Sequence, residues 1–198
     1  MLTLEETWKK LIELGIVQGD MPKVNWNLSG ANLSGVYLNE ADLSGANLSE
    51  ADISGAFLIG SNLTGANLNK AKLYKANLSG TYLNKSNLTG GDIREADLSE
   101  ADLFKTDLSK ADLSGANLSG ANLTKANLCG ANLSESNLSG ARLNGANLSG
   151  ADLTGANLSG AFLIETNLSG ANIKEANFSD ADLSGAILSG TGLGAENQ

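Results

Sequence analysis

The side chains that could do chemistry in this chain of 198 residues are carboxylates, amines and one thiol. There are 22 Asp and Glu, 13 Lys and Arg, one cysteine (Cys129) and no histidine. Without histidine the chain lacks the usual general base, the usual partner of a nucleophilic Ser or Cys, and the commonest metal ligand. A Gly-rich phosphate loop of the type GxxxxGK[ST] is also missing from the sequence. We therefore expect a protein that is not an enzyme and that carries neither a cofactor nor a metal.

One series of carboxylates falls at a regular spacing of five residues. Its members are Asp92, Asp97, Asp102, Asp107 and Asp112. Cations at Arg94, Lys105 and Lys110 lie close enough in the sequence to neutralise part of the series. A solvated belt of carboxylates is therefore favoured over an ion-binding site. Cys129 takes a slot that usually holds Ser, which indicates an outward-facing thiol without a second cysteine or a base to support redox chemistry.

A repeat of five residues must position all of these side chains. From Leu28 to Leu193, every position whose number ends in 3 or 8 is Leu or Ile, except Phe178. The residue two places earlier is nearly always Ala or another small residue. Extended side chains alternate between two faces, so an odd period keeps both apolar positions inside only if the chain turns once per repeat. The sequence therefore predicts a stacked solenoid with an aliphatic interior.

The residue two places after Leu marks the turn. It is Gly in 19 of the 34 repeats, which suits a turn position with a positive φ. Lys or Glu stands there in most of the others, so we expect that not every corner demands glycine.

Units such as A-N-L-S-G at Ala116–Gly120 and Ala146–Gly150 resemble the pentapeptide-repeat family, whose consensus is A(D/N)LXX. The chain is most similar to cyanobacterial members without an assigned activity. The resemblance implies an all-β solenoid, a right-handed quadrilateral β-helix of about eight coils with four repeats per coil. Residues 20 apart would then stack at the strand spacing of ~4.8 Å. We expect a cap at residues 1–25, the β-helix at 26–195 and a tail at 196–198.

The N-terminal segment predicts a short amphipathic helix from about Leu4 to Glu13. Its apolar face is formed by Leu4, Trp8, Leu11 and Ile12. Thr3 and Glu6 form a capping box at its start, Gly15 is a plausible residue just past its end, and Pro22 is a stop. Because the open end of a solenoid exposes Leu side chains and unpaired backbone groups, this helix is expected to cover it. Trp26, in a slot that later repeats fill with Ala, supports a contact with the helix.

Two faces of the implied coil break the consensus with aromatic, aliphatic and basic side chains. One carries Tyr82, Phe104, Arg142, Phe162 and Ile164, with Lys85, Lys105 and Lys125 aligned along its corner. The neighbouring face carries Tyr37, Phe57 and Ile59. Exposed aromatic side chains beside cations are typical of interfaces, so these residues are the candidate partner-binding surface. The alternative is that they are single surface hydrophobes without a role.

A further face carries a ladder of carboxamides. It consists of Asn27, Asn47, Asn67, Asn87, Asp107, Asn127, Asn147 and Asn167. Such a ladder is either a flat recognition surface or a set of side chains that hydrogen-bond locally along the stack.

Charge and composition limit the partners. The net charge of −9 disfavours direct binding of nucleic acid. No apolar stretch approaches the ~18 residues needed to span a bilayer, so we expect no membrane insertion. The single cysteine fits a reducing compartment, and the N-terminus lacks the pattern of a signal peptide. We expect a cytoplasmic protein, with the periplasm or a lumen open if a targeting segment has been removed.

The sequence predicts a non-catalytic scaffold that binds an unidentified protein through its outward faces. The resemblance implies an alternative, inhibition of DNA gyrase by mimicry of duplex DNA. Mimicry of DNA would require an unbroken acidic stripe. Between Lys70 and Lys125, however, the sequence has eight cations and seven carboxylates, which argues against this alternative. A purely structural protein without a ligand is a third reading. Ile187, Leu188 and Leu193 lie at the last coil, so either the tail folds across them or two rods meet in a weak end-to-end dimer.

Overall fold

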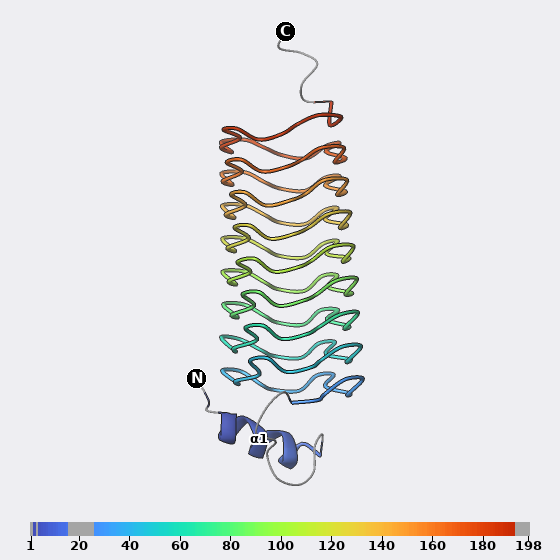
Figure 1. Cartoon of the computed structure of the whole chain (residues 1–198), viewed down its shortest axis with the longest axis vertical. Helices are drawn as coiled ribbons and strands as arrows, with labels where there is room; N and C mark the ends of the chain where they lie inside the picture. Colours follow the sequence, from blue (N-terminus) through green and yellow to red (C-terminus); the bar gives the residue numbers. More distant parts are fainter. Residues whose placement is uncertain (1, 3, 16–25, 193–198) are drawn as a thin grey trace.

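The computed structural model describes residues 2, 4–15 and 26–192. Within them, one helix, α1 (Leu4–Glu13), lies below a column of stacked coils (Figure 1). The described residues form no continuous strand, because each side of a coil contributes a single residue to a parallel bridge. The expectations for Thr3, Pro22 and Leu193, and for the side chain of Leu4, concern positions outside the described residues.

The register of the stack is 20 residues throughout. Bridges join one residue of each repeat, the one before the buried Leu, to the residue 20 places later, from Asn27 with Asn47 to Asn167 with Ile187. Across the corner between two repeats, the carbonyl oxygen of Leu28 accepts a hydrogen bond from the amide of Ala31 at 3.0 Å, and the same bond recurs every five residues. Four turns in each period of 20 residues make a coil with four faces.

Every described corner has the same backbone conformation, whatever its side chain. Gly30 has a φ of 66° and Lys75 a φ of 56°, and the other Lys and Glu corners are alike. A positive φ at this place in a hydrogen-bonded turn is the mark of a type II turn, which favours glycine. Glycine is not required at every corner, as expected, but each side chain there holds the left-handed conformation at a cost of roughly 1–2 kcal/mol. Open space around the corner, where a Cβ on Gly150 would meet nothing within 4 Å, lets long side chains project into solvent.

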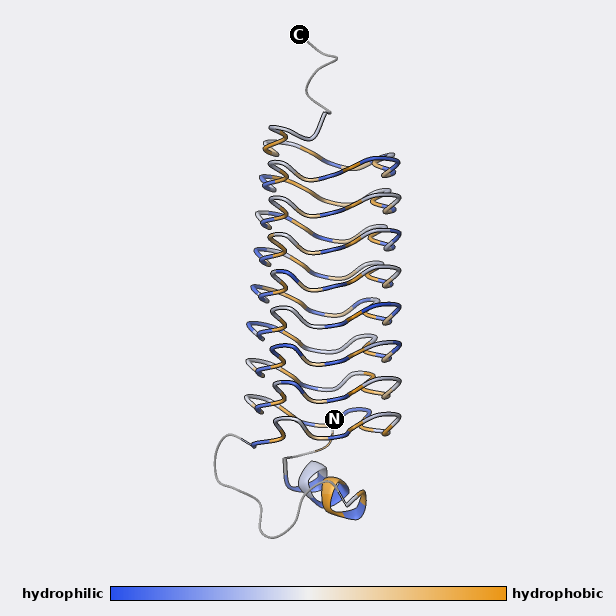
Figure 2. Cartoon of the chain, turned by 90° about the vertical axis from the view of Figure 1, so that its right-hand side faces the viewer, coloured by the Kyte–Doolittle hydropathy of each residue, from blue (hydrophilic) through white to orange (hydrophobic). Residues whose placement is uncertain are grey.

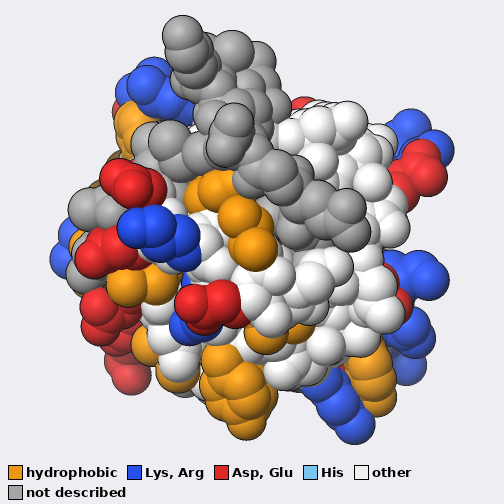
Figure 3. Space-filling view, turned by 90° about the horizontal axis from the view of Figure 1, so that it is seen from below, with side chains coloured by type: hydrophobic (Ala, Val, Ile, Leu, Met, Phe, Trp, Pro, Cys, Tyr) orange, Lys and Arg blue, Asp and Glu red, His pale blue; other side chains and the backbone are white. Residues whose placement is uncertain are grey.

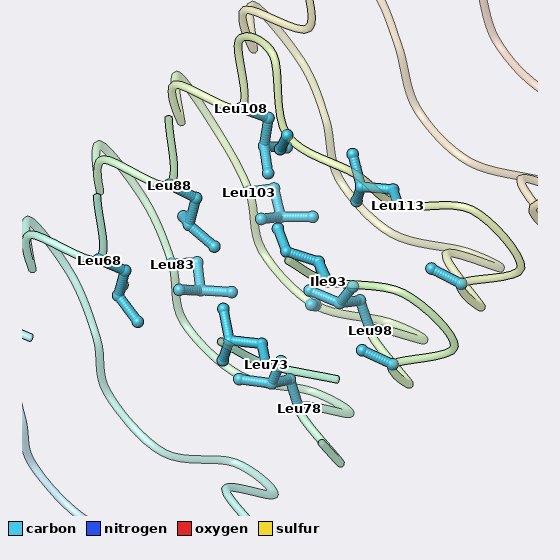
Figure 4. Close-up of a cluster of buried hydrophobic side chains, with 14 of the residues drawn as sticks. Leu68, Leu73, Leu78, Leu83, Leu88, Ile93, Leu98, Leu103, Leu108 and Leu113 are labelled. Carbon is cyan, nitrogen blue, oxygen red and sulfur yellow. The ribbon is translucent and has the colours of Figure 1, made fainter. Parts of the chain in front are cut away.

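The Leu and Ile positions fill the interior of the column. Leu68, Leu88 and Leu108 stack one above another along one face, and the neighbouring faces stack likewise (Figure 4). The apolar segments recur at the same places in each coil (Figure 2). From Leu33 to Leu168 these side chains are almost completely buried, each contributing roughly 1.5–3 kcal/mol.

The residue before Leu holds the turn from outside. Oδ1 of Asn27 accepts a hydrogen bond from the amide of Ser29 at 3.2 Å and another from Nδ2 of Asn47, one coil above, at 3.1 Å. The pair of bonds recurs along the carboxamide ladder, for example at Asn47 and Asn147. The structure therefore uses the ladder for local hydrogen bonds, the second of the two readings.

Helix α1 packs against the first coil through Trp8 and Leu11, both buried. The rings of Trp8 and Trp26 meet edge to face with centroids 5.2 Å apart. Gly15 has a φ of 70° and donates its amide to the carbonyl of Ile12, as expected of the residue that follows a helix.

Ile12 was expected in the apolar face of α1, and this was wrong: its side chain is 42% exposed. Thr7 is fully buried instead, and its Oγ1 accepts a hydrogen bond from the backbone amide of Asp42 at 2.9 Å. At 3.6 residues per turn, burying Thr7, Trp8 and Leu11 together rotates Ile12 to the edge of the buried face. The helix therefore covers the coil edge with a hydrogen bond as well as with apolar contacts.

The C-terminal end of the described column is less covered. Ile173, Phe178, Leu183 and Leu188 are partly exposed, although they belong to the interior columns, and Ile187 is exposed.

Candidate partner-binding surface

Tyr37 and Phe57 form the first part of the candidate surface. They are bridged neighbours in successive coils, and their rings stack with centroids 4.6 Å apart and planes 2° apart. Tyr37 is 61% exposed and Ile59 is also exposed. We call Tyr37, Asn39, Phe57 and Ile59 the N-terminal patch.

Phe57 stands where other repeats carry Asn or Asp, so it cannot cap the turn that follows it. The amide of Ile59 is nevertheless satisfied, because Oδ1 of Asn39, one coil below, accepts its hydrogen bond at 3.0 Å. An apolar side chain has thus replaced a capping one without leaving the turn uncapped.

The second part of the candidate surface runs along the adjacent face. We call it the cationic face, and it comprises Tyr82, Lys85, Phe104, Lys105, Lys125, Arg142, Asn144, Phe162 and Ile164. Tyr82 and Phe162 are each 46% exposed, and Nζ of Lys105 lies 5.1 Å from the centroid of the Phe104 ring. Viewed along the column, hydrophobic, basic and acidic side chains all project from the wall of the coils (Figure 3).

A surface depression lies towards the C-terminal end of the cationic face, lined by Arg142, Asn144 and Phe162. Arg142 and Phe162 are bridged neighbours. Oδ1 of Asn144 accepts a hydrogen bond from the amide of Ile164 at 3.2 Å, just as Asn39 does for Ile59. The same arrangement therefore occurs twice, on two faces.

The cationic face carries more positive than negative charge within a chain whose net charge is −9. Its cations are Lys85, Lys105, Lys125 and Arg142, and the ion pairs seen among the described residues involve other cations. Asp102 is a carboxylate of this face, and it accepts hydrogen bonds from Nδ2 of Asn84 and from Nδ2 of Asn122. The four cations are therefore available to a partner.

The structure does not join the two parts into one site. Tyr37 and Phe57 belong to the column of bridges that continues to Asn177, and Tyr82 belongs to the adjacent column, which runs from Asp42 to Asp182. The candidate surface is thus two patches on neighbouring faces.

Sequence reasoning missed a third cluster, on another face, around Tyr74. Its hydroxyl donates to Oε1 of Glu95 at 3.3 Å, and Nζ of Lys75 lies 3.3 Å from Oε2 of the same carboxylate. Lys75 and Arg94 both lie over the Tyr74 ring. The spacing of 20 between positions 74 and 94, and between 75 and 95, could have revealed the cluster. Its charges are paired within the cluster, so it is a weaker candidate for binding.

The carboxylate belt is largely engaged in local bonds. Arg94 binds Asp92 through Nε at 2.7 Å and through a second nitrogen at 2.8 Å, and the bond from Arg94 is the main reason why the pKa of Asp92 is lowered. Asp107 and Asp112 each accept the amide of the residue two places later. Among the described residues, no group of three or more Cys, Asp or Glu side chains is placed to hold a metal ion. Cys129 is exposed, with the Ser149 hydroxyl 3.5 Å from its sulfur.

The chain belongs to the pentapeptide-repeat family. The family model for pentapeptide repeats matches it in eight copies. The matched stretches are residues 27–65, 58–90, 82–120, 111–150, 121–160 and 151–190. The fold is accordingly the right-handed quadrilateral β-helix of that family. Members are generally non-catalytic scaffolds.

Several solved structures are similar to this chain. HetL, a pentapeptide-repeat protein involved in heterocyst differentiation regulation in Nostoc sp. PCC 7120, is 31% identical over 96% of this chain and 94% of its own, with a TM-score of 0.39. QnrB1, a plasmid-mediated fluoroquinolone resistance protein, is 21% identical over 81% and 86%, with a TM-score of 0.60. Rfr23 from the cyanobacterium Cyanothece 51142 is 26% identical over 90% and 95%, with a TM-score of 0.21. Among curated proteins no match is found.

The described part of the chain holds no helix with the length and apolar character needed to cross a membrane.

Proposed function

We propose that this protein is a non-catalytic scaffold that binds a protein partner through the N-terminal patch and the cationic face. One observation carries the proposal. Phe57 and Phe162 each displace a capping side chain, and Asn39 and Asn144 each supply the missing cap from one coil below. The β-helix gains no interior packing from the exposed aromatic rings, so their presence is best explained by contact with something outside the chain.

The rest of the molecule supports a binding role rather than a catalytic one. The chain lacks histidine, and its aspartates mostly accept turn amides on the outward faces. Interfaces favour aromatic and Arg side chains at their centres, and the cationic face supplies Tyr82, Phe162 and Arg142 within one column of bridges. We place this activity in the cytoplasm, in keeping with the single free thiol.

The test uses substitutions that restore the repeat consensus and so preserve the fold. Tyr82→Asn, Phe162→Asn and Phe104→Ser are combined in one chain, which is used to capture proteins from the native host for identification by mass spectrometry. We expect the partner captured by wild type to be lost. The matched control is Tyr74→Ser, which removes an aromatic ring from a different face and should leave capture unchanged. Retention of the same partner by the combined variant would refute the role proposed for the cationic face, provided that both variants unfold at temperatures close to that of wild type.

Inhibition of DNA gyrase is the alternative function. The likeness to QnrB1 is one of fold, since the identity is 21%. Duplex mimicry requires a continuous acidic surface, and the column of Lys85, Lys105 and Lys125 interrupts it. In a supercoiling assay we expect no inhibition of gyrase at micromolar protein.

A further inference from the structure

We infer that the depression lined by Arg142, Asn144 and Phe162 is a subsite for a carboxylate side chain of an acidic peptide segment, with an apolar neighbour of that carboxylate against Phe162 and Ile164. The inference rests on the proposed function and names the chemistry of the partner. It follows from the donors that the depression presents, the apolar side chains beside them, and the direction in which neighbouring corner residues lean.

The polar groups of the depression are hydrogen-bond donors. Oδ1 of Asn144 is occupied by the amide of Ile164, which orients the carboxamide so that Nδ2 is left for another partner. The guanidinium of Arg142 forms no ion pair with the described residues. A guanidinium and an amide NH2 have no acceptor to offer, so the matching ligand group is an acceptor. A carboxylate fits best, because charge-assisted bonds to Arg are the strong ones.

Lys125 adds a second positive charge at the edge of the depression. A Cβ placed on Gly145, the corner that follows Asn144, would lie 3.6 Å from Cγ of Lys125. The Lys125 side chain therefore leans upwards against the corner beside the depression. The glycine at position 145 leaves room for it.

Glu165, the nearest corner carboxylate on the next coil, leans the same way and so points away from the depression. A Cβ on Gly185, one coil above it, would lie 3.5 Å from Cγ of Glu165. Because both side chains lean in the same direction, Lys125 lies towards Arg142, whereas Glu165 lies away from it. Lys105 and Lys85 continue the positive corner downwards at ~4.8 Å per coil, so an acidic chain lying along the column would pass a cation at each of these coils.

The apolar side chains distinguish a peptide from a nucleic acid. Phe162 and Ile164 are exposed directly beside the donors, and Phe104 and Tyr82 follow below them. A peptide that alternates acidic and apolar side chains matches both features. A polyphosphate offers negative charge alone and would leave the exposed side chains of Phe162 and Ile164 without an apolar partner.

The test begins with selection of linear 12-residue peptides from a random displayed library on the immobilised full chain. We expect enrichment of Asp or Glu next to an apolar residue. The selected peptide, made synthetically with a fluorophore, is then titrated with each variant by fluorescence anisotropy. Arg142→Asn restores the consensus and should weaken binding about tenfold or more, as expected for the loss of a charge-assisted hydrogen bond. The matched control, Arg94→Ser, removes the same charge from another face and should change the affinity less than about twofold, since surface charges distant from a ligand are screened.

Three results would overturn the inference: no enriched peptide, enriched peptides without carboxylates, or equal loss of affinity in both variants. A single-stranded DNA oligonucleotide that binds wild type and is lost with Arg142→Asn would also overturn it, in favour of a nucleic acid. The proposed function fails separately. If the variant with Tyr82, Phe104 and Phe162 replaced still captures the host partner, the proposed role of the cationic face in that capture falls even where the acidic peptide binds as inferred.

Discussion

Asn144 accepts a hydrogen bond from the amide of Ile164, one coil above it, at 3.2 Å. The same bond joins Asn39 and Ile59 at 3.0 Å on the neighbouring face. In both places a Phe precedes the buried Leu of the upper coil, where an Asn or Asp would normally cap the turn. At these two positions the coil below supplies the missing cap through an Asn one residue after its own Leu.

Replacing Asn144 should uncover this dependence. In Asn144→Ala the amide of Ile164 loses its partner, and we expect the chain to be destabilised by about 0.5–1.5 kcal/mol. Phe162→Asn in the same chain should restore most of the loss, because a carboxamide at that position caps the turn in other repeats, as Asn122 does for Thr124. Denaturant unfolding of the single and double variants measures both effects. Strictly additive losses would show that Asn144 does not act as a substitute cap.

The buried hydroxyl at Ser61 should be a weak point of the interior. Its Oγ is the buried side-chain oxygen or nitrogen without a hydrogen bond in the described part of the chain, whereas Oγ of Ser86 donates to the carbonyl of Leu83 at 2.7 Å. We expect Ser61→Ala to stabilise the protein by roughly 1 kcal/mol, because an unpaired polar group is removed. Ser86→Ala should be neutral or destabilising. The unfolding midpoints of the two variants are compared with that of wild type. Equal shifts would contradict the conclusion that the Ser61 hydroxyl is unpaired and the Ser86 hydroxyl is paired.

Acid should weaken the turns that are capped by Asp. The pKa of Asp152 is lowered, chiefly by the hydrogen bond from the Thr154 hydroxyl and then by the Thr154 amide. The pKa of Asp52 and that of Asp182 are lowered in the same way by Ser54 and Ser184. A carboxyl whose pKa is lower in the folded state contributes stability above its unfolded pKa and loses it as the pH falls through the folded value. We expect unfolding free energy to be steady between about pH 7 and 5 and to fall below about pH 4.

Asp152→Asn tests the origin of that acid sensitivity. At pH 7 it should change stability little, because Oδ1 of Asn132 accepts the same two bonds from Ser134 at 3.1 and 2.8 Å. At low pH the variant should lose less stability than wild type. If the unfolding free energy of the variant falls with pH as steeply as that of wild type, other carboxyl groups cause the acid sensitivity.

The cap formed by α1 should depend on a hydroxyl as well as on its tryptophan. Thr7→Val keeps the shape of the side chain but leaves the amide of Asp42 without an acceptor, at a cost of about 1–3 kcal/mol. Thr7→Ser keeps the oxygen and should cost less. Thermal unfolding of the two variants provides the comparison. A valine variant as stable as the serine variant would mean that the hydrogen bond contributes nothing.

Most of the architecture followed from the repeat, because a period of five with Leu and Ala two apart leaves the chain few ways to bury both. Trp8, Leu11 and Trp26 were predicted in the cap from helical spacing and from a bulky residue in a slot for Ala. Thr7 was missed because nothing local marks a polar side chain that bonds a backbone 35 residues away. The error at Ile12 followed directly, since the helix rotates to bury Thr7.

The candidate surface was predicted less completely. A spacing of 20 residues placed Tyr37 and Phe57 together on one face and Arg142 and Phe162 together on its neighbour, and both pairs are bridged. The roles of Asn39 and Asn144 were not predicted, because Asn is abundant in this sequence and neither residue lies directly before a buried Leu, where Asn usually caps the turn. Their role depends on the direction of a hydrogen bond between coils, which composition does not encode.

The uniform register has a consequence for how such a molecule changes over evolutionary time. Because one repeat is one side of the coil, deleting five residues turns everything beyond the deletion through a quarter revolution without disturbing the interior. Loss of residues 131–135, for example, would bring Arg142 and Phe162 into the column that holds Tyr37 and Phe57. Insertion of 20 residues between the two patches would instead increase the distance between them along the column, and each patch would stay on its own face. Angle and distance between binding groups are thus adjustable independently, in fixed steps.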